Sequence, residues 1–317
     1  MSNFLSPGQL MIGTSKAWFC GQDGSVYELT GGSSGGNHIP EIDTDFTYSG
    51  EYQIIDDSDV SNPGDWRIKF LTSGNLVFKN NTNIDLFLVG GGGAGGASIS
   101  DSARFPGGGG GYTKTVKNIL ATKQTEYKIT VGDGATPPST NSSTQGGTSS
   151  AFGNSVDGGY TAINGTRYNN YVGSGGDGGS GGGGYTDVTM SGGSNGGSNG
   201  SNGTQMYCSG TTNSNFIGMG TGQGSTTREF GEESGDLYAG GGGGGGGGSD
   251  RNMVGYGGEG GGGNGGETLY MSTTVVKNAT SGTANTGGGG GGSSWNPNGV
   301  ATPGSGGSGI VVIRNSR

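Results

Sequence analysis

The chain has 317 residues, of which 82 are Gly and 8 are Pro, so more than a quarter of it consists of residues that interrupt helices and strands. This composition excludes an ordinary globular fold, and the pure glycine runs with little Pro exclude collagen. The net charge of −9, with Lys and Arg spread along the chain, excludes the basic surface that nucleic-acid binding needs.

Residues 1–45 form a first region, in which short apolar runs at 10–12, 17–20 and 26–29 predict short strands. A GGSSGG stretch at 31–36 predicts a flexible connector, and His38 follows it in a loop. With one His in the chain, a His-rich zinc site is excluded.

The N-terminus has no basic segment followed by an apolar core, and no apolar run approaches the roughly 18 residues of a membrane span. We therefore expect synthesis in the cytoplasm without a signal peptide, and no membrane insertion. A disulfide between Cys20 and Cys208 stays open, since two unpaired thiols also fit a reducing cytosol.

A strand-rich texture begins at residue 46. Apolar and charged residues alternate in WRIKF (66–70), which predicts a strand buried on one face, whereas the continuously apolar residues 86–89 predict a central strand covered on both faces. The predicted strands are 46–55, 66–71, 76–78, 84–89, 112–116, 127–131, 149–152, 160–164 and the closing 310–313.

Glycine tracts are interleaved with these strands and dominate after residue 172. A lone tract is a flexible coil, but packed threefold polyglycine II helices can hydrogen-bond laterally, because their backbone groups point outward and no Cβ atoms keep them apart. At about 3.1 Å per residue, nine glycines would span about 28 Å. The tracts are 90–96, 107–111, 173–184, 192–203, 240–248, 255–266, 287–292 and 304–309.

Eight antiparallel tracts would return the chain to its starting end and bring strand 310–313 beside strand 84–89. A partial tract at 218–224 leaves this parity open. The predicted fold class is all-β plus a polyglycine II helix bundle, with a small β-sandwich-like region, left-handed glycine helices and essentially no α-helix. The predicted domains are residues 1–45, 46–172 and 173–317.

Large side chains collect in the segments between tracts. With eight tracts, the segments 97–106, 185–191, 249–254 and 293–303 lie at the end far from the β region, while 204–239 and 267–286 lie toward it. Aromatic, Arg and Asn side chains on a rigid scaffold favour recognition, although they could instead cap the bundle. The candidate recognition residues are Arg104, Phe105, Tyr185, Met190, Arg251, Asn252, Met253, Trp295 and Asn296.

No pattern of catalytic or cofactor-binding residues stands out, so we expect no catalytic residues, no metal and no cofactor. The acids Asp56, Asp57, Asp59 and Asp65 are read as a solvated turn, with calcium binding as the alternative. Two carboxylates suffice for glycoside hydrolysis, and Glu232, Glu233 and Asp236 are close in sequence; they are expected to be solvated.

The strand sequences carry a family likeness. WRIKFLTSGNLVF and IDLFLVGGGGAGG, followed by GGGGGYTKTV, YKITVGDG and a closing GGSGIVVIR, resemble the glycine-rich tail-fibre and receptor-binding adhesins of bacteriophages over residues 46–317. The resemblance implies a polyglycine II bundle at a fibre tip whose loops bind a bacterial surface receptor, protein or glycan. It also implies a location in the virion and release by cell lysis.

Residues 1–45 do not match the attachment module of those adhesins, and we expect them to dock onto another phage fibre or baseplate protein. The alternative function is a non-adhesive structural component of a virion, such as a fibre spacer, baseplate or capsid decoration protein. An ice-binding protein is a further alternative, against which the tracts lack a repeating Thr period.

Overall fold

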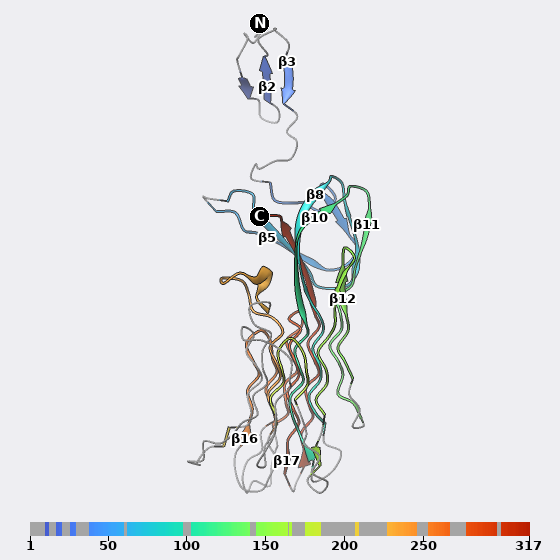
Figure 1. Ribbon diagram of the computed structural model, residues 1–317, viewed down its shortest axis with the longest axis vertical. Helices are drawn as coiled ribbons and strands as arrows, with labels where there is room; N and C mark the ends of the chain where they lie inside the picture. The colour runs from blue at the N-terminus through green and yellow to red at the C-terminus, as the bar shows by residue number, and fades with distance from the viewer. Residues whose placement is uncertain are drawn as a thin grey trace. The chain divides into compact units, whose positions relative to one another are not determined.

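The structure is a computed structural model. The chain forms two compact units (Figure 1). The first unit contains residues 1–39 and 57–65, and the second contains residues 40–56 and 66–317. The structure describes residues 10–12, 17–20, 26–29, 38–59, 62–97, 103–139, 144–163, 165–166, 175–184, 207–208, 227–245, 253–266, 277–296 and 299–317.

The first unit contains a three-stranded antiparallel sheet in the order β1-β2-β3. Its strands are β1 (Leu10–Ile12), β2 (Ala17–Cys20) and β3 (Val26–Leu29). Strand β2 pairs with both neighbours, from Leu10 opposite Phe19 to Cys20 opposite Val26. The short apolar runs therefore predicted these strands correctly.

The larger sheet of the second unit has five antiparallel strands in the order β10-β8-β19-β6-β5. They are β5 (Tyr52–Asp56), β6 (Trp66–Phe70), β8 (Thr82–Val89), β10 (Thr113–Ala121) and β19 (Ile310–Asn315). The C-terminal strand β19 lies between β8 and β6, which confirms that the closing strand joins the strand that opens the first glycine tract.

The second sheet has the order β11-β7-β4, with β4 (Phe46–Tyr48), β7 (Gly74–Phe78) and β11 (Glu126–Ile129). Thr130 and Ser150 exchange backbone hydrogen bonds of 2.8 and 2.9 Å, which continue this sheet into β12 (Ser149–Ala151) and β13 (Asn154–Val156). Strand β13 was not predicted. The strand predicted at 160–164 is wrong, because Tyr160 makes an isolated bridge to Gln145 within the glycine bundle.

Both faces of the larger sheet are covered. Phe70 lies opposite Val311, which lies opposite Leu88, so these side chains share a face, and Tyr48 of the second sheet packs on the Phe70 ring at 4.6 Å. The opposite face carries Phe87, Val89, Ile310 and Val312, which pack with Phe230, Tyr238 and Ala239. The prediction that residues 86–89 form a centrally buried strand is confirmed.

Short elements complete the second unit. The two-stranded pairs are β9 (Ala103–Arg104) with β14 (Gly165–Thr166), β15 (Tyr207–Cys208) with β16 (Met253–Val254), and β17 (Trp295–Asn296) with β18 (Gly299–Val300). A single 3-10 turn, η2 (Glu229–Gly231), is the one helical element in the described ranges.

The glycine tracts pack as a bundle below the sheets, as Figure 1 shows. In the tract formed by residues 287–294, here called the central tract, Gly290 and Ser293 donate to Gly93 and Gly96 at 2.9 and 3.0 Å. Gly289 and Gly292 donate in turn to Gly240 and Gly243 at 2.8 and 2.9 Å. Every third residue thus donates to the same neighbouring tract, which is the repeat of a threefold helix.

The first tract shows the same repeat. Gly93 and Gly96 donate to Gly109 and Pro106, both at 2.8 Å, and Gly92 and Gly95 donate to the tract that precedes β19. Within the central tract, Gly287 at its first position is the one residue with a positive φ. A threefold repeat with negative φ is the left-handed polyglycine II helix, as the sequence predicted.

Close packing explains why these residues are glycine. A Cβ atom built on any of Gly288 to Gly292 would approach a carbonyl oxygen of another tract well inside 3.0 Å, a separation that real Cβ atoms essentially never show. All residues of the central tract are buried. Gly288 to Gly292 therefore fill the interior of the bundle with backbone alone. The N–H groups of Gly289 to Gly292 donate to carbonyls of other tracts, and the Gly288 N–H donates to the Thr286 hydroxyl.

The number and composition of the tracts differ from the prediction. Residues 255–266 were expected to form one tract but form two, because a turn at 259–261 with φ of 87° at Gly260 and 95° at Gly261 reverses the chain. Segments with few glycines also join as outer tracts, since Thr161 donates to Thr144 and Thr283 donates to Gly261. The predicted tract 192–203 lies outside the described residues.

The sheets and the bundle belong to one compact unit, which differs from the predicted domain boundary at 172/173. Strand β19 follows the last tract yet sits in the middle of the larger sheet. Tracts before and after residue 172 also hydrogen-bond directly, as between Gly108 and Gly290 at 2.8 Å. The two parts therefore stabilise each other.

We predict that Gly290→Ala lowers the free energy of unfolding by about 1–3 kcal/mol, because its Cβ would overlap the backbone of Gly304. Gly153→Asn is the matched control: Gly153 has a φ of 71° with no atom near its Cβ position, and Asn tolerates this conformation. Denaturant unfolding of both variants measures the difference. Equal stabilities would contradict close packing at Gly290.

Candidate functional site

The bundle end that lies away from the sheets is here called the distal end, and the sequence predicted that all the candidate recognition residues lie there. Strand β8 leads into the first tract at Gly90, so Gly96 lies far from the sheets. Ser293 donates to Gly96 at 3.0 Å, Gly245 donates to Phe105 at 2.7 Å, and Gly266 donates to Gly292 at 2.8 Å. Several tracts therefore end at one level.

The structure places four of the predicted residues at the distal end. Arg104 lies in β9, Met253 in β16, and Trp295 and Asn296 in β17. Figure 1 shows β16 and β17 at this end of the bundle. Tyr185, Met190, Arg251 and Asn252 lie outside the described residues. Their flanking tracts reach the same end, because Gly183 accepts from Gly107 at 2.8 Å and Gly245 lies beside Phe105.

Phe105 does not fit a recognition role. Its relative exposure is 0%, and its carbonyl accepts the Gly245 N–H. Burial of this large apolar ring removes it from water, which is favourable. Phe105 is therefore assigned to the core of the bundle, and its prediction as a receptor contact is wrong.

The reversal within residues 255–266 also changes the end of the bundle at which this stretch finishes. Residue 266 lies there, and the next described tract begins at residue 277 and donates to the last tract, from Ala279 to Thr302, at 3.1 Å. Residues 267–286 were predicted to lie toward the sheets, and the turn at 284–287 does so. Residue 266 and the start of the tract at residue 277 lie near the distal end. Glycine runs carry no sequence signal for such a reversal.

A second feature is the segment 227–239, here called the clasp, which covers the larger sheet. Its Glu229 is 1% exposed and accepts from Arg67 Nη1 at 2.6 Å and from the Tyr238 hydroxyl at 2.8 Å, and it forms an ion pair with Lys69 Nζ at 3.2 Å. Arg67 and Lys69 lie on β6, which was predicted to be buried on one face only. They hold the acidic clasp against the sheet.

Arg314 extends this network across the same face of the sheet. Its Nε lies 3.3 Å from Asp85 Oδ2, its Nη1 lies 2.6 Å from Glu232 Oε1, and its guanidinium lies 4.1 Å from the centre of the Phe230 ring. Asp85 also accepts from the backbone N–H of Asn118 at 3.0 Å, where β10 bulges. Both Arg314 and Asp85 are buried, so each compensates the charge of the other.

The carboxylates considered for hydrolysis lie in this clasp. Glu232 is paired with Arg314, and Asp236 lies 2.9 Å from Lys69. The hydrogen bond from Lys69 lowers the pKa of Asp236 below its usual value, although partial burial opposes the shift. A general acid needs a raised pKa, so this environment favours a structural role for Asp236.

The acidic turn of the first unit uses its polar groups internally. Asp57 N–H donates to the Asp65 carbonyl at 2.9 Å, Asn62 N–H donates to Asp59 Oδ1 at 2.6 Å, and Gly64 N–H donates to Ser58 Oγ at 3.0 Å. Among the residues that the structure describes, no group of three or more His, Cys, Asp or Glu side chains is arranged to hold a metal ion. The turn geometry therefore gives no support to the calcium alternative.

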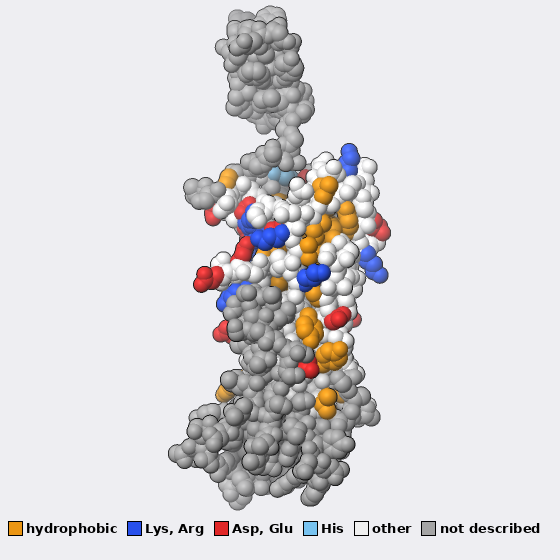
Figure 2. Space-filling model, viewed as in Figure 1, with side chains coloured by type: hydrophobic (Ala, Val, Ile, Leu, Met, Phe, Trp, Pro, Cys, Tyr) orange, Lys and Arg blue, Asp and Glu red, His pale blue; other side chains and the backbone are white. Residues whose placement is uncertain are grey.

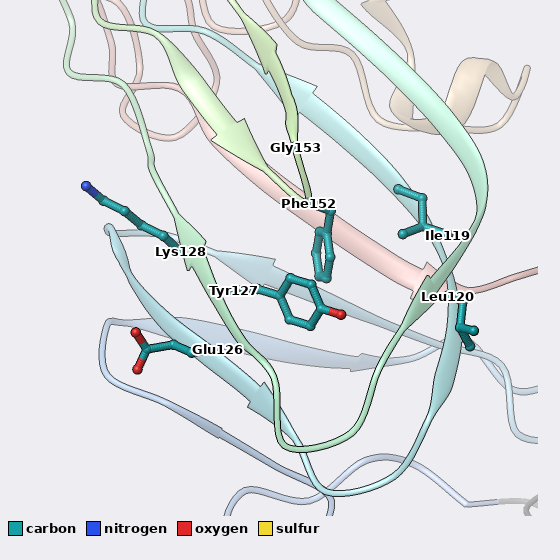
Figure 3. Close-up of a pocket in the computed structure, with 7 residues that line it drawn as sticks. All are labelled: Ile119, Leu120, Glu126, Tyr127, Lys128, Phe152 and Gly153. Carbon is teal, nitrogen blue, oxygen red and sulfur yellow. The ribbon is translucent and has the colours of Figure 1, made fainter.

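A cleft of about 440 Å³ opens at the side of the sandwich and was not foreseen from the sequence (Figure 3). The Tyr127 and Phe152 rings lie on one side of it, with centres 4.6 Å apart, and Ile119 and Leu120 of β10 lie on the other. Phe152 begins a two-residue turn and has a φ of 49°, which is unusual for a bulky residue. Glu126 and Lys128 also line the cleft, so its surface is partly apolar and partly charged.

The comparisons with known proteins agree with the glycine-rich architecture. Residues 72–316 match the model of a family described as a glycine-rich domain, and the chain belongs to this family. The match begins before β7 and ends one residue after β19, so it includes the bundle and the later strands of both sheets, whereas β4, β5 and β6 precede it. No curated protein and no solved structure gave a match.

Within the ranges that the structure covers, no helix has the length and apolar character needed to cross a bilayer.

We predict that Arg314→Met lowers the free energy of unfolding by about 3–5 kcal/mol, because it leaves Asp85 buried without its cation. Lys128→Met on the exposed side of β11 is the control and is expected to change stability by less than about 0.5 kcal/mol. Denaturant unfolding gives both values. A small effect at Arg314 would contradict its role in joining the clasp to the sheet.

Proposed function

We propose that the protein is a bacteriophage receptor-binding adhesin, carried in the virion, that recognises a bacterial surface receptor through the distal end of its bundle. The observation that carries the proposal is the convergence of several tract ends at one level, with side-chain-bearing segments between them. A rigid scaffold that presents connecting segments together is a common basis for recognition.

The rigidity of the bundle supports this function. Each interior tract is fixed by backbone hydrogen bonds to several neighbours, so its end is held in place without side-chain packing. Segments anchored at both ends lose less conformational entropy on binding than free segments do, which favours affinity. A long glycine-rich chain would otherwise be a poor support for a binding surface.

The residue types at the distal end also support recognition. Arg104, Met253, Trp295 and Asn296 lie in strand pairs there, and the sequence adds Tyr185, Met190, Arg251 and Asn252 in the adjoining segments. Trp, Tyr and Arg are the residues that dominate binding energy at interfaces, and aromatic rings with amide groups suit sugars as well. The receptor class is therefore a surface protein or glycan.

Residues 1–45 are proposed to attach the protein to another fibre or baseplate protein. The first unit, with its own three-stranded sheet, is distinct from the unit that carries the bundle. Separate units for attachment and recognition fit a protein at the tip of a fibre. The alternative, a structural virion component without receptor binding, would use the same bundle as a spacer.

Binding of the labelled full-length protein to a panel of bacterial cells and envelope fractions tests the proposal. We expect saturable binding that weakens at least about tenfold in the combined variant Arg251→Ala/Trp295→Ala, a loss of roughly 1.4 kcal/mol. The matched control is Tyr160→Ala, whose exposed ring lies on the side of the bundle.

A larger variant separates the two functions. Replacing residues 185–191 and 246–252 with Gly and Ser leaves the described tracts intact. If this variant binds cells as tightly as the natural protein, the adhesin proposal is wrong. If neither protein binds any cell in the panel while both are folded by circular dichroism, the structural alternative is favoured.

A further inference from the structure

The two outer strands of the five-stranded sheet differ in how their edges are protected. Strand β10 has a bulge between Val116 and Ile119, with Asn118 at a φ of 58°. It also carries Lys114, whose Nζ donates to Asn154 of β13 at 3.0 Å, and Lys117. Bulges and lysines are the features by which proteins prevent other strands from pairing with an edge.

Strand β5 at the opposite edge has neither feature. It pairs with β6 in an unbroken register from Tyr52 opposite Phe70 to Asp56 opposite Trp66. The sequence YQIID contains no Lys, Arg or Pro. Among the strands that the structure describes, β6 is its one partner. A regular edge of this kind is a template for another strand.

The hydrogen bonds beside β5 determine which of its backbone groups face outward. Leu71 N–H donates to the Glu51 carbonyl at 2.9 Å, and Asp57 N–H donates to the Asp65 carbonyl at 2.9 Å. In an antiparallel ladder, alternate residues bond to the same neighbour, so Gln53 and Ile55 also bond to β6. The N–H and C=O groups of Tyr52 and Ile54 therefore point toward the open edge.

The side chains at this edge are incompletely covered. Tyr52, Ile54 and Ile55 are half-buried, unlike Ile68 and Phe70 on the neighbouring strand, which are fully buried. A further strand beside β5 would cover these apolar groups and satisfy the outward backbone groups together. Both gains come from the same contact.

We propose that β5 pairs with β5 of a second copy of the chain, antiparallel and about a two-fold axis at Gln53. This register places Tyr52 opposite the partner's Ile54, so that the outward backbone groups of both residues bond across the axis. It places Glu51 opposite the partner's Ile55, and no acid faces another acid. The two sheets then form one continuous sheet.

Charge disfavours two alternative arrangements. A parallel pair in register would set Asp56 against the partner's Asp56. An antiparallel pair centred on Ile54 would set Glu51 opposite the partner's Asp57. Like charges directly opposite each other destabilise a sheet, so the register at Gln53 is favoured over both. An isologous contact of this kind closes as a dimer and does not propagate into a fibre.

Light scattering and sedimentation of the full chain over a wide dilution series test the pairing. We expect a species of twice the 31.2 kDa chain mass that dissociates on dilution. Ile54→Lys should shift the protein to the monomer, while Leu120→Lys, at the protected edge and 57% exposed in its natural form, should leave the dimer unchanged. Circular dichroism confirms that each variant is folded.

Cross-linking keeps the test independent of the folding of Ile54→Lys. Opposed residues that do not share hydrogen bonds lie about 4.5 Å apart between Cα atoms, which a disulfide can span. In a Cys20→Ser/Cys208→Ser background, Gln53→Cys should form a covalent dimer on mild oxidation, and Ser155→Cys on β13 should not. A protein that is monomeric at all concentrations, a trimer, or a dimer that forms without cross-linking through residue 53 would overturn the proposal.

Discussion

The structure depends on lateral hydrogen bonds between backbones that approach each other without Cβ atoms. In the central tract, successive N–H groups donate in three directions, so one tract joins several neighbours, and each added Cβ would overlap a carbonyl. Glycine loses the most entropy when it is ordered, so these bonds must form together to offset that cost. A single tract would be a flexible coil, whereas the tracts of the bundle become ordered together.

The sheets fix the positions at which the first tract of the bundle starts and the last tract ends. A glycine tract has no side chains to set its register, whereas β8 and β19 are apolar strands that pair in a defined register from Ile310 opposite Val89. The start of the first tract therefore lies beside the end of the last tract. The clasp adds a second connection, because Glu229 and Glu232 bind cations of β6 and β19. In the view of Figure 2, most of the visible Lys and Arg side chains lie over the upper part of the described surface, and fewer charged side chains are seen on the described surface below it.

Apolar patterning and glycine runs were sufficient to predict most strands, the polyglycine II helices and the return of residues 310–313 to the opening strand. Features without local patterning were missed. Strand β13 has the sequence NSV, which has little strand signal, and the ion pairs of Glu229 join residues far apart in sequence. The reversal at 259–261 lies in a glycine run that looks uniform. For the distal end, sequence indicated the segments but not the burial of Phe105, because an aromatic residue beside glycine can serve either recognition or packing.

The central claim is that the glycine tracts are hydrogen-bonded helices and not flexible linkers, and amide hydrogen exchange tests it most directly. Buried and bonded amides exchange through opening of the structure, whereas amides of a coil exchange at their intrinsic rates. We predict that the amides of residues 288–293 exchange as slowly as those of β8. Exchange of these glycines at the intrinsic rate, while β8 stays protected, would contradict the bundle and with it the rigid support on which the proposed function rests.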